Sequence, residues 1–268
     1  MDNDKLINMM VNRSVNVVAQ KREHVIGDVV FSVEHLTRAG VLHDVSFNVR
    51  KGEILGLFGL VGAGRTEAVR AALGVDKYDH AEITLDGKPI QFKHIGQALK
   101  AGIALVPEER RKQGILPNTP ITRNVTIGNL SQFTKFGMLN EKAEKKYAKT
   151  ATDKLSVACT SVQQTVGSLS GGNQQKVVIS KYIDRDIKVF ILDEPTRGIV
   201  VGAKDQIYTI IENLAKQGMA VIVISSEIPE LQLMCDRVCI MSEGKVISEM
   251  TREEFIDSDN VLKNAIGI

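Results

Sequence analysis

The chain has 268 residues, of which 43% are hydrophobic, so it can bury a sizeable core in one large α/β domain or two small ones. The formal net charge is only +2, aromatic residues make up 4% and tryptophan is absent, which argues against a nucleic-acid-binding surface. The longest purely apolar runs, such as residues 220–224, are far shorter than the ~20 residues that span a bilayer. If the protein works at a membrane, a partner must span it.

The predicted elements alternate between strands and helices on both sides of a helical region. Residues 1–28 are polar and weakly patterned, and we interpret them as a helical piece and a linker. Residues 117–168 have few strand signals, which predicts a separate helical lobe. Strands are expected at residues 29–33, 45–49, 54–58, 83–85, 103–106, 189–192, 220–224 and 238–241, and helices at residues 66–73, 95–101, 204–217 and 229–234. This alternation predicts a parallel sheet flanked by helices.

A glycine-rich loop follows the strand at residues 54–58 and precedes a helix, which is the context that a phosphate-binding loop requires. Its glycines let backbone N–H groups wrap an anion, and Thr66 offers a hydroxyl for a magnesium ion. The loop and the start of the helix comprise Gly59, Leu60, Val61, Gly62, Ala63, Gly64, Arg65, Thr66 and Glu67. The spacing is that of G-x-x-x-x-G-K-[ST] with Arg65 in place of lysine. Since arginine is a bulkier planar fork, we expect a bound nucleotide whose terminal phosphate is clamped imperfectly.

Two further motifs point to phosphate chemistry. The strand at residues 189–192 ends at Asp193 and Glu194, where the first carboxylate can hold magnesium and the second can orient or deprotonate a water. A turn at residues 170–172, with the sequence Ser-Gly-Gly, opens a polar helix. Because free N–H groups at a helix start favour an anion, this turn is a second candidate phosphate contact.

Residues 59–66, 169–176 and 189–195 resemble the Walker A, signature and Walker B motifs of the ATP-binding cassette (ABC) family. The resemblance covers roughly residues 29–250 and implies an α/β P-loop NTPase with a parallel core sheet, an antiparallel β subdomain and an inserted helical lobe. It implies ATP and Mg²⁺ as cofactors, with Thr66 and Asp193 on the metal and Glu194 and Asp193 in catalysis. The implied nucleotide contacts are Gly59, Val61, Gly62, Ala63, Gly64, Arg65, Thr66, Glu67, Glu108, Ser170, Gly171, Gly172, Gln174 and Glu227.

A narrower resemblance is to the second cassette of bacterial sugar importers of the ribose, galactoside, xylose and autoinducer type. Residues 59–67, 106–110 and 225–231 carry it, and residues 9–13 resemble the tail of the first cassette in such proteins. We therefore expect residues 29–268 to form the ATP-binding domain of a longer or split protein. The implied partners are a first cassette, a membrane permease and, indirectly, a periplasmic or extracellular sugar-binding protein, without nucleic acid. The implied location is cytoplasmic, peripheral to the inner face of the cell membrane.

Several positions depart from an active cassette. Glu108 stands where a glutamine precedes the helical lobe, and Glu227 stands where a histidine contacts the γ-phosphate. All five histidines precede residue 95, so no histidine fills that role. We expect a carboxylate there to repel the γ-phosphate. Val200 replaces the aspartate that is usual in the loop after Walker B.

These departures predict that the chain's own phosphate loop binds nucleotide and hydrolyses it slowly or not at all. Family members pair head to tail, so we expect Ser170, Gly171 and Gly172 to contact the γ-phosphate held by a partner cassette. The alternatives are a non-hydrolysing regulatory dimerisation module and, less favoured, a soluble ABC ATPase. Residues 107–116 match the groove that receives a coupling helix of the permease, where the charges of residues 110–112 could make contacts or stay solvated.

Overall fold

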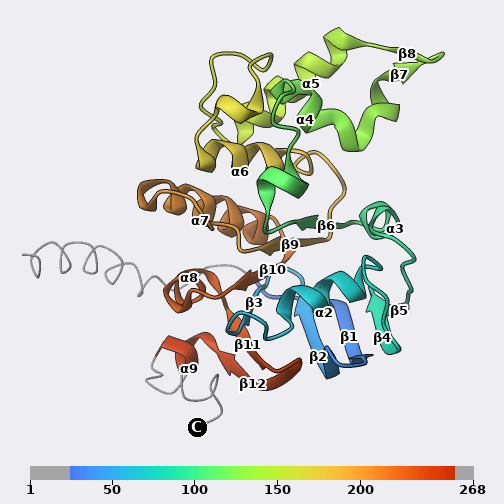
Figure 1. Ribbon diagram of the computed structural model, residues 1–268, viewed down its shortest axis with the longest axis vertical. Coiled ribbons are helices and arrows are strands. Elements are labelled where there is room, and N and C mark those ends of the chain that lie inside the picture. The colour runs from blue at the N-terminus through green and yellow to red at the C-terminus, as the bar shows by residue number, and fades with distance from the viewer. Residues whose placement is uncertain (1–24, 257–268) are drawn as a thin grey trace, which may run out of the picture.

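A six-stranded sheet lies at the centre of the computed structural model, which describes residues 25–256 (Figure 1). Its strand order is β12-β11-β3-β10-β9-β6, and every neighbouring pair is parallel except β11 and β12. The strands are β3 (Ile54–Phe58), β6 (Ile103–Val106), β9 (Val189–Asp193), β10 (Ala220–Ser225), β11 (Arg237–Ser242) and β12 (Lys245–Thr251). The predicted parallel sheet is confirmed, with β12 as an antiparallel edge.

A second, antiparallel sheet has the strand order β2-β1-β4-β5. Its strands are β1 (Val29–Arg38), β2 (Leu42–Arg50), β4 (His80–Leu85) and β5 (Lys88–Pro89). Strand β1 runs five residues beyond the predicted range, through a register shift between Val33 and Leu36. His35 sits there at φ 54°, so Glu34 and His35 are both exposed and the alternation that marks a strand is broken. This bulge explains why the sequence pattern predicts too short a strand.

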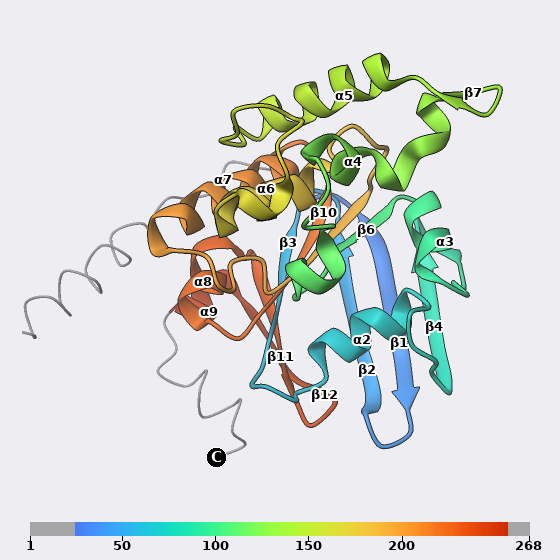
Figure 2. The same cartoon turned by 45° about the horizontal axis from the view of Figure 1, so that its top comes forward.

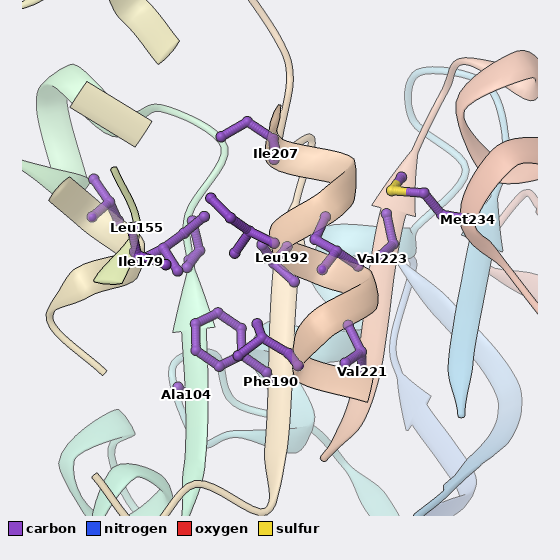
Figure 3. Packing of buried hydrophobic residues seen from close by; sticks show 14 of the residues in the cluster. Ala104, Leu155, Ile179, Phe190, Leu192, Ile207, Val221, Val223 and Met234 are labelled. Carbon is purple, nitrogen blue, oxygen red and sulfur yellow. The ribbon is translucent and has the colours of Figure 1, made fainter. Parts of the chain in front are cut away.

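Both faces of the central sheet are buried. Val221 and Val223 of β10 point toward α7 (Val201–Lys216) and α8 (Ile228–Met234), and Figure 3 shows them in one apolar cluster with Phe190. Ile222 and Ile224 point the other way, into a cluster shared with α2 (Arg65–Ala72) and the antiparallel sheet. Because strands covered on both sides need apolar residues throughout, β3, β9 and β10 read as continuous apolar runs.

A helical lobe lies above the sheet in Figure 1. It contains η1 (Arg110–Gly114), α4 (Ile121–Thr126), η2 (Ile127–Phe133), β7 (Thr134–Lys135), β8 (Met138–Leu139), α5 (Glu141–Lys154), η3 (Val166–Ser168) and α6 (Gly171–Ser180). The hairpin of β7 and β8 is an addition to the prediction, and its two-residue turn at Phe136 and Gly137 has φ values of 51° and 77°. Helix α6 reads as polar, but Gln174, Gln175 and Lys176 are all buried.

Three short helices complete the described chain, namely α3 (Ile95–Lys100), α8 and α9 (Arg252–Ile256). Across residues 25–256 we find no helix with the length and hydropathy needed to cross a bilayer. The expected cassette tail at residues 9–13, and most of the expected linker at residues 1–28, lie outside the described residues.

Candidate functional site

The glycine-rich loop joins the carboxyl end of β3 to α2, so it lies at one edge of the parallel sheet. A Cβ atom at Gly59 would come within 2.5 Å of the carbonyl oxygen of Met241, and Gly64 caps α2 at φ 93°, so both positions require glycine. Between them Val61 is 94% exposed. In the described part of the chain no side chain caps α2. The loop therefore offers exposed backbone and the free N–H groups of a helix start to an anion.

Thr66 and Asp193 meet at the carboxyl end of the sheet although they are 127 residues apart in the chain. The Thr66 hydroxyl donates to Oδ2 of Asp193 over 2.8 Å. Burial raises the pKa of Asp193 to about 6, against the opposing effect of the Thr66 hydrogen bond. Its other oxygen, Oδ1, is buried and has no hydrogen-bond partner among residues 25–256. A buried carboxylate oxygen without a partner, next to a hydroxyl, suits a hard cation such as Mg²⁺.

Arg65 is turned toward the catalytic candidate Glu194. Its Nη1 donates to Oε1 of Glu194 over 3.4 Å, and the two side chains are only 9% and 10% exposed. The same oxygen accepts the backbone N–H of Ser226 over 2.9 Å. Glu194 has φ 44°, in the left-handed region that side chains rarely adopt. The guanidinium that replaces the usual lysine therefore lies against a carboxylate at the end of β9.

Two other carboxylates that depart from the family pattern are also paired with cations. Lys204 donates to both oxygens of Glu227 over 2.8 and 2.7 Å. Glu108, which follows β6, forms an ion pair with Arg197. Both cations lie between β9 and the first turn of α7. Because Lys204 offsets the charge of Glu227, the repulsion expected from a bare carboxylate at residue 227 is weaker in the folded protein.

The signature turn, defined here as residues 169–172, leads into α6. Ser170 is exposed, and its hydroxyl accepts a bond of 3.0 Å from Nδ2 of Asn173. Gln174 points inward instead, where its amide donates to the carbonyl of Leu169 over 3.0 Å. Figures 1 and 2 both place α6 beside α7 and across the sheet from α2. The signature turn is thus separated from the chain's own phosphate loop.

The sequence reasoning did not single out Lys204 or Glu230. Glu230 is buried and accepts the hydroxyls of Thr196, over 2.7 Å, and Ser225. Burial raises its pKa. This network joins the end of β9 to the end of β10, next to Glu227. No sequence motif marks either residue, since each is identified only by its contacts in the folded chain, that of Lys204 with Glu227 and that of Glu230 with Thr196.

A phosphate loop and an acid pair at the same edge of a parallel sheet define a P-loop NTPase. A profile of the family described as ABC transporter matches residues 42–197. The chain therefore belongs to the ABC transporter family. The solved structure of a nucleotide-free ATP-binding cassette from an ABC transporter has a TM-score of 0.77 at 21% identity, covering 90% of this chain and 100% of that one. At this identity the likeness shows the fold alone, which is the predicted ABC cassette.

Curated relatives are considerably more similar in sequence. The ribose import ATP-binding protein RbsA 1 of Streptomyces coelicolor is 44% identical over 267 residues, which is 100% of this chain and 53% of the relative. The putative ribose/galactose/methyl galactoside import ATP-binding protein 1 of Rhizobium etli is 43% identical over 98% of this chain and 50% of the relative. The chain spans about half the length of the curated relatives that it matches.

Proposed function

We propose that this chain is an ATP-binding cassette of a bacterial sugar importer. In this proposal it binds Mg²⁺ and ATP at its own glycine-rich loop and lends its signature turn to a partner cassette that hydrolyses ATP. The observation that carries the proposal is the contact between Thr66 and Asp193, with one buried carboxylate oxygen left without a partner. The import function rests on the relatives, which are named as ribose and galactoside import proteins.

The loop and the acid pair have different roles in the proposed site. The backbone of residues 59–67 surrounds the phosphates, and Thr66 and Asp193 hold the metal, which when bound neutralises phosphate charge and orients the terminal phosphate. Glu194 orients the attacking water. Val61, Ala63 and Glu67 contribute N–H groups rather than side-chain chemistry.

The proposed weakness of this site follows from the ion pair of Arg65 and Glu194. The guanidinium lies 3.4 Å from the carboxylate and holds it in an ion pair, so Glu194 is less free to orient a water. The same guanidinium is less available for the terminal phosphate. Loss of one well-placed charge stabiliser commonly lowers a rate by ~10²–10³. We therefore propose slow turnover at this site and faster turnover at the site that Ser170 completes in a partner cassette.

The permease is the second proposed partner. A groove of about 430 Å³ opens on the helical lobe, and we call it the lobe groove. It is lined by Leu116, Thr119, Arg123, Ile127, Leu130, Thr134 and Leu139. Leu116 and Ile127 are 45% and 47% exposed, so apolar surface is available to an amphipathic helix of a membrane subunit at the cytoplasmic side. The sugar-binding protein would act through that subunit.

Calorimetry with ATP tests the proposed metal and nucleotide site. Asp193→Asn should weaken ATP binding in the presence of Mg²⁺ on the order of tenfold to a hundredfold, and should change binding in EDTA much less. Asp205→Asn, at an exposed position of α7, is the matched control and should bind as the unaltered chain does. Equal binding by both variants with Mg²⁺ would refute the assignment of Asp193.

The ion pair of Arg65 and Glu194 also favours a second function, a regulatory cassette that binds nucleotide and only holds a dimer together. The two functions differ in the role of the signature turn. Ser170→Ala in the assembled importer should lower ATP turnover and transport at the partner site if the turn contacts the partner's γ-phosphate. Unchanged transport would favour the regulatory cassette.

A further inference from the structure

We infer that Arg110 is a positioning residue that holds the signature turn and the loop after β9 in one fixed arrangement. The inference rests on the proposed pairing of cassettes, because the signature turn would act on a partner's nucleotide. The loop in question, residues 194–200, is called the acid-pair loop below, since it begins at Glu194. Residues 108–114, between β6 and the lobe, are called the arginine segment.

The guanidinium of Arg110 touches both motifs. Its Nη1 donates to the carbonyl of Arg197 over 2.7 Å, and its Nη2 donates to the carbonyl of Gly198 over 3.1 Å. A Cβ atom placed on Gly171 would lie 2.7 Å from the same Nη2. The guanidinium therefore fills the space between the acid-pair loop and the first residue of α6, where only glycine leaves room for it.

The arginine segment is fastened at both ends. At its start, Glu108 pairs with the side chain of Arg197. At its end, Nζ of Lys181 donates to the carbonyl of Gly114, and burial lowers the pKa of this lysine to about 8. Since Lys181 follows the last residue of α6, the segment is tied at its start to the acid-pair loop and at its end to the carboxyl end of this helix. Any shift of the segment must be shared by α6 and the acid-pair loop.

The contacts of Arg110 require a planar fork. Two carbonyls accept from two separate nitrogens, which arginine presents in a fixed geometry and the single ammonium of lysine does not. The Nε of Arg110 is buried without a hydrogen-bond partner in the described part of the chain. A buried donor left unpaired is costly, so the two hydrogen bonds to the carbonyls must offset that cost where the side chain lies. From sequence, Arg110 was one of three charges that could contact a permease or stay solvated, and in the structure its guanidinium is held by the acid-pair loop.

The acid-pair loop links the position of Arg110 to that of Glu194. The N–H of Arg197 donates to the carbonyl of Glu194 over 3.1 Å, so the two backbone positions move together. On the other side, the guanidinium lies against Gly171, next to the exposed hydroxyl of Ser170. The side chain of Arg110 thus sets the position of Glu194, in the chain's own nucleotide site, relative to Ser170, which we propose completes the partner's site.

Hydrogen exchange in the 268-residue chain tests the clamp directly. Arg110→Ala and Arg110→Lys should each speed amide exchange in peptides covering residues 169–173 and 196–200 by about tenfold or more, and should leave α5 (Glu141–Lys154) unchanged. The matched control is Arg50→Ala, which removes an exposed arginine from β2 in the antiparallel sheet. Slow exchange retained in Arg110→Lys would overturn the inference, because a positive charge alone would then be sufficient. An equal rise of exchange in α5 would overturn it too, because the variant would then lower the stability of the whole chain.

Turnover measurements in an assembly with a catalytic partner cassette separate this inference from the proposed function. Arg110→Lys should lower kcat at least several-fold and leave the KM for ATP unchanged, because the residue positions groups and does not bind ATP at its own loop. A raised KM with unchanged kcat would contradict a positioning role. If Ser170→Ala has no effect in the same assembly, the proposed pairing fails. The local exchange result with Arg110→Lys would then still establish the clamp within the chain.

Discussion

The buried carboxylate of Asp193 makes a prediction that links stability to pH. Its pKa is raised from 3.8 to about 6, chiefly by burial. A raised pKa means that the folded state binds the proton more tightly than the unfolded state. The stabilisation by that proton is fully present below pH 3.8 and is lost as the pH rises through about 6. The whole shift corresponds to about 3 kcal/mol, at 1.36 kcal/mol for each pKa unit, and about 2 kcal/mol of this cost to the folded chain develops between pH 4 and pH 8.

Replacing the carboxylate by an amide removes this cost while keeping the shape of the side chain. We expect Asp193→Asn to gain stability relative to the unaltered chain as the pH rises from 4 to 8, by about 1–3 kcal/mol without metal. Mg²⁺ with ATP should reverse the order at pH 8, because only the carboxylate is stabilised by the ion.

Urea denaturation at four or five pH values, with and without Mg²⁺ and ATP, provides the measurement. The quantity to compare is the difference in unfolding free energy between Asp193→Asn and the unaltered chain, since other titrating groups cancel in it. The exposed control Asp205→Asn should give a difference that does not vary with pH. A difference for Asp193→Asn that is equally flat would show that the carboxylate is not held in the buried environment described here, and the magnesium assignment would lose its physical basis.

Three further predictions concern the charges and the lobe. Lys204→Ala should weaken Mg²⁺-dependent ATP binding several-fold, because it leaves Glu227 unpaired. Calorimetry of the double variant Lys204→Ala and Glu227→Ala should show that ATP affinity is recovered. If the affinity stays low, Lys204 acts independently of Glu227. The double variant Arg65→Lys and Glu227→His should raise ATP turnover at this site by about tenfold or more in the presence of a partner cassette, and an unchanged phosphate-release rate would contradict the assigned defects. Leu130→Asp should abolish binding to permease-containing vesicles in a flotation assay without altering ATP affinity, and retained binding would place the permease elsewhere.

The features that could be predicted from sequence depend on local pattern. Strand β3 matches the predicted range of 54–58, because a strand covered on both faces is a continuous apolar run with clear ends. The phosphate loop could be predicted because its glycine spacing is dictated by how a backbone surrounds a phosphate, and the acid pair because it ends an apolar strand. The predicted end of β1 was wrong because the bulge at His35 exposes two successive residues.

The features that could not be predicted depend on contacts between distant residues. Helix α6 looks polar in sequence, yet Gln174 and Lys176 are buried because their nitrogens donate to nearby backbone carbonyls, that of Lys176 to the carbonyl of Ser156 over 2.9 Å. Glu227 looks like an unpaired carboxylate until Lys204 is seen beside it, 23 residues away in sequence. Sequence alone therefore predicted which groups meet at the carboxyl end of the sheet, but it could not show that Glu227 is paired with a lysine.

The three charged positions among the four altered ones share one feature. Arg65, Glu108 and Glu227 each differ in charge or shape from the family residue, and each is ion-paired within the chain. Each of these three charges is therefore balanced by a partner of opposite charge within the chain. Restoring the neutral family residue at Glu108 or Glu227 breaks one pair and leaves its cation without that partner. That cation, Arg197 or Lys204, is then free to make a new contact, which neither this chain nor the family pattern has. The change in activity of a single reversion therefore contains the effect of the broken ion pair as well as the effect of the restored residue.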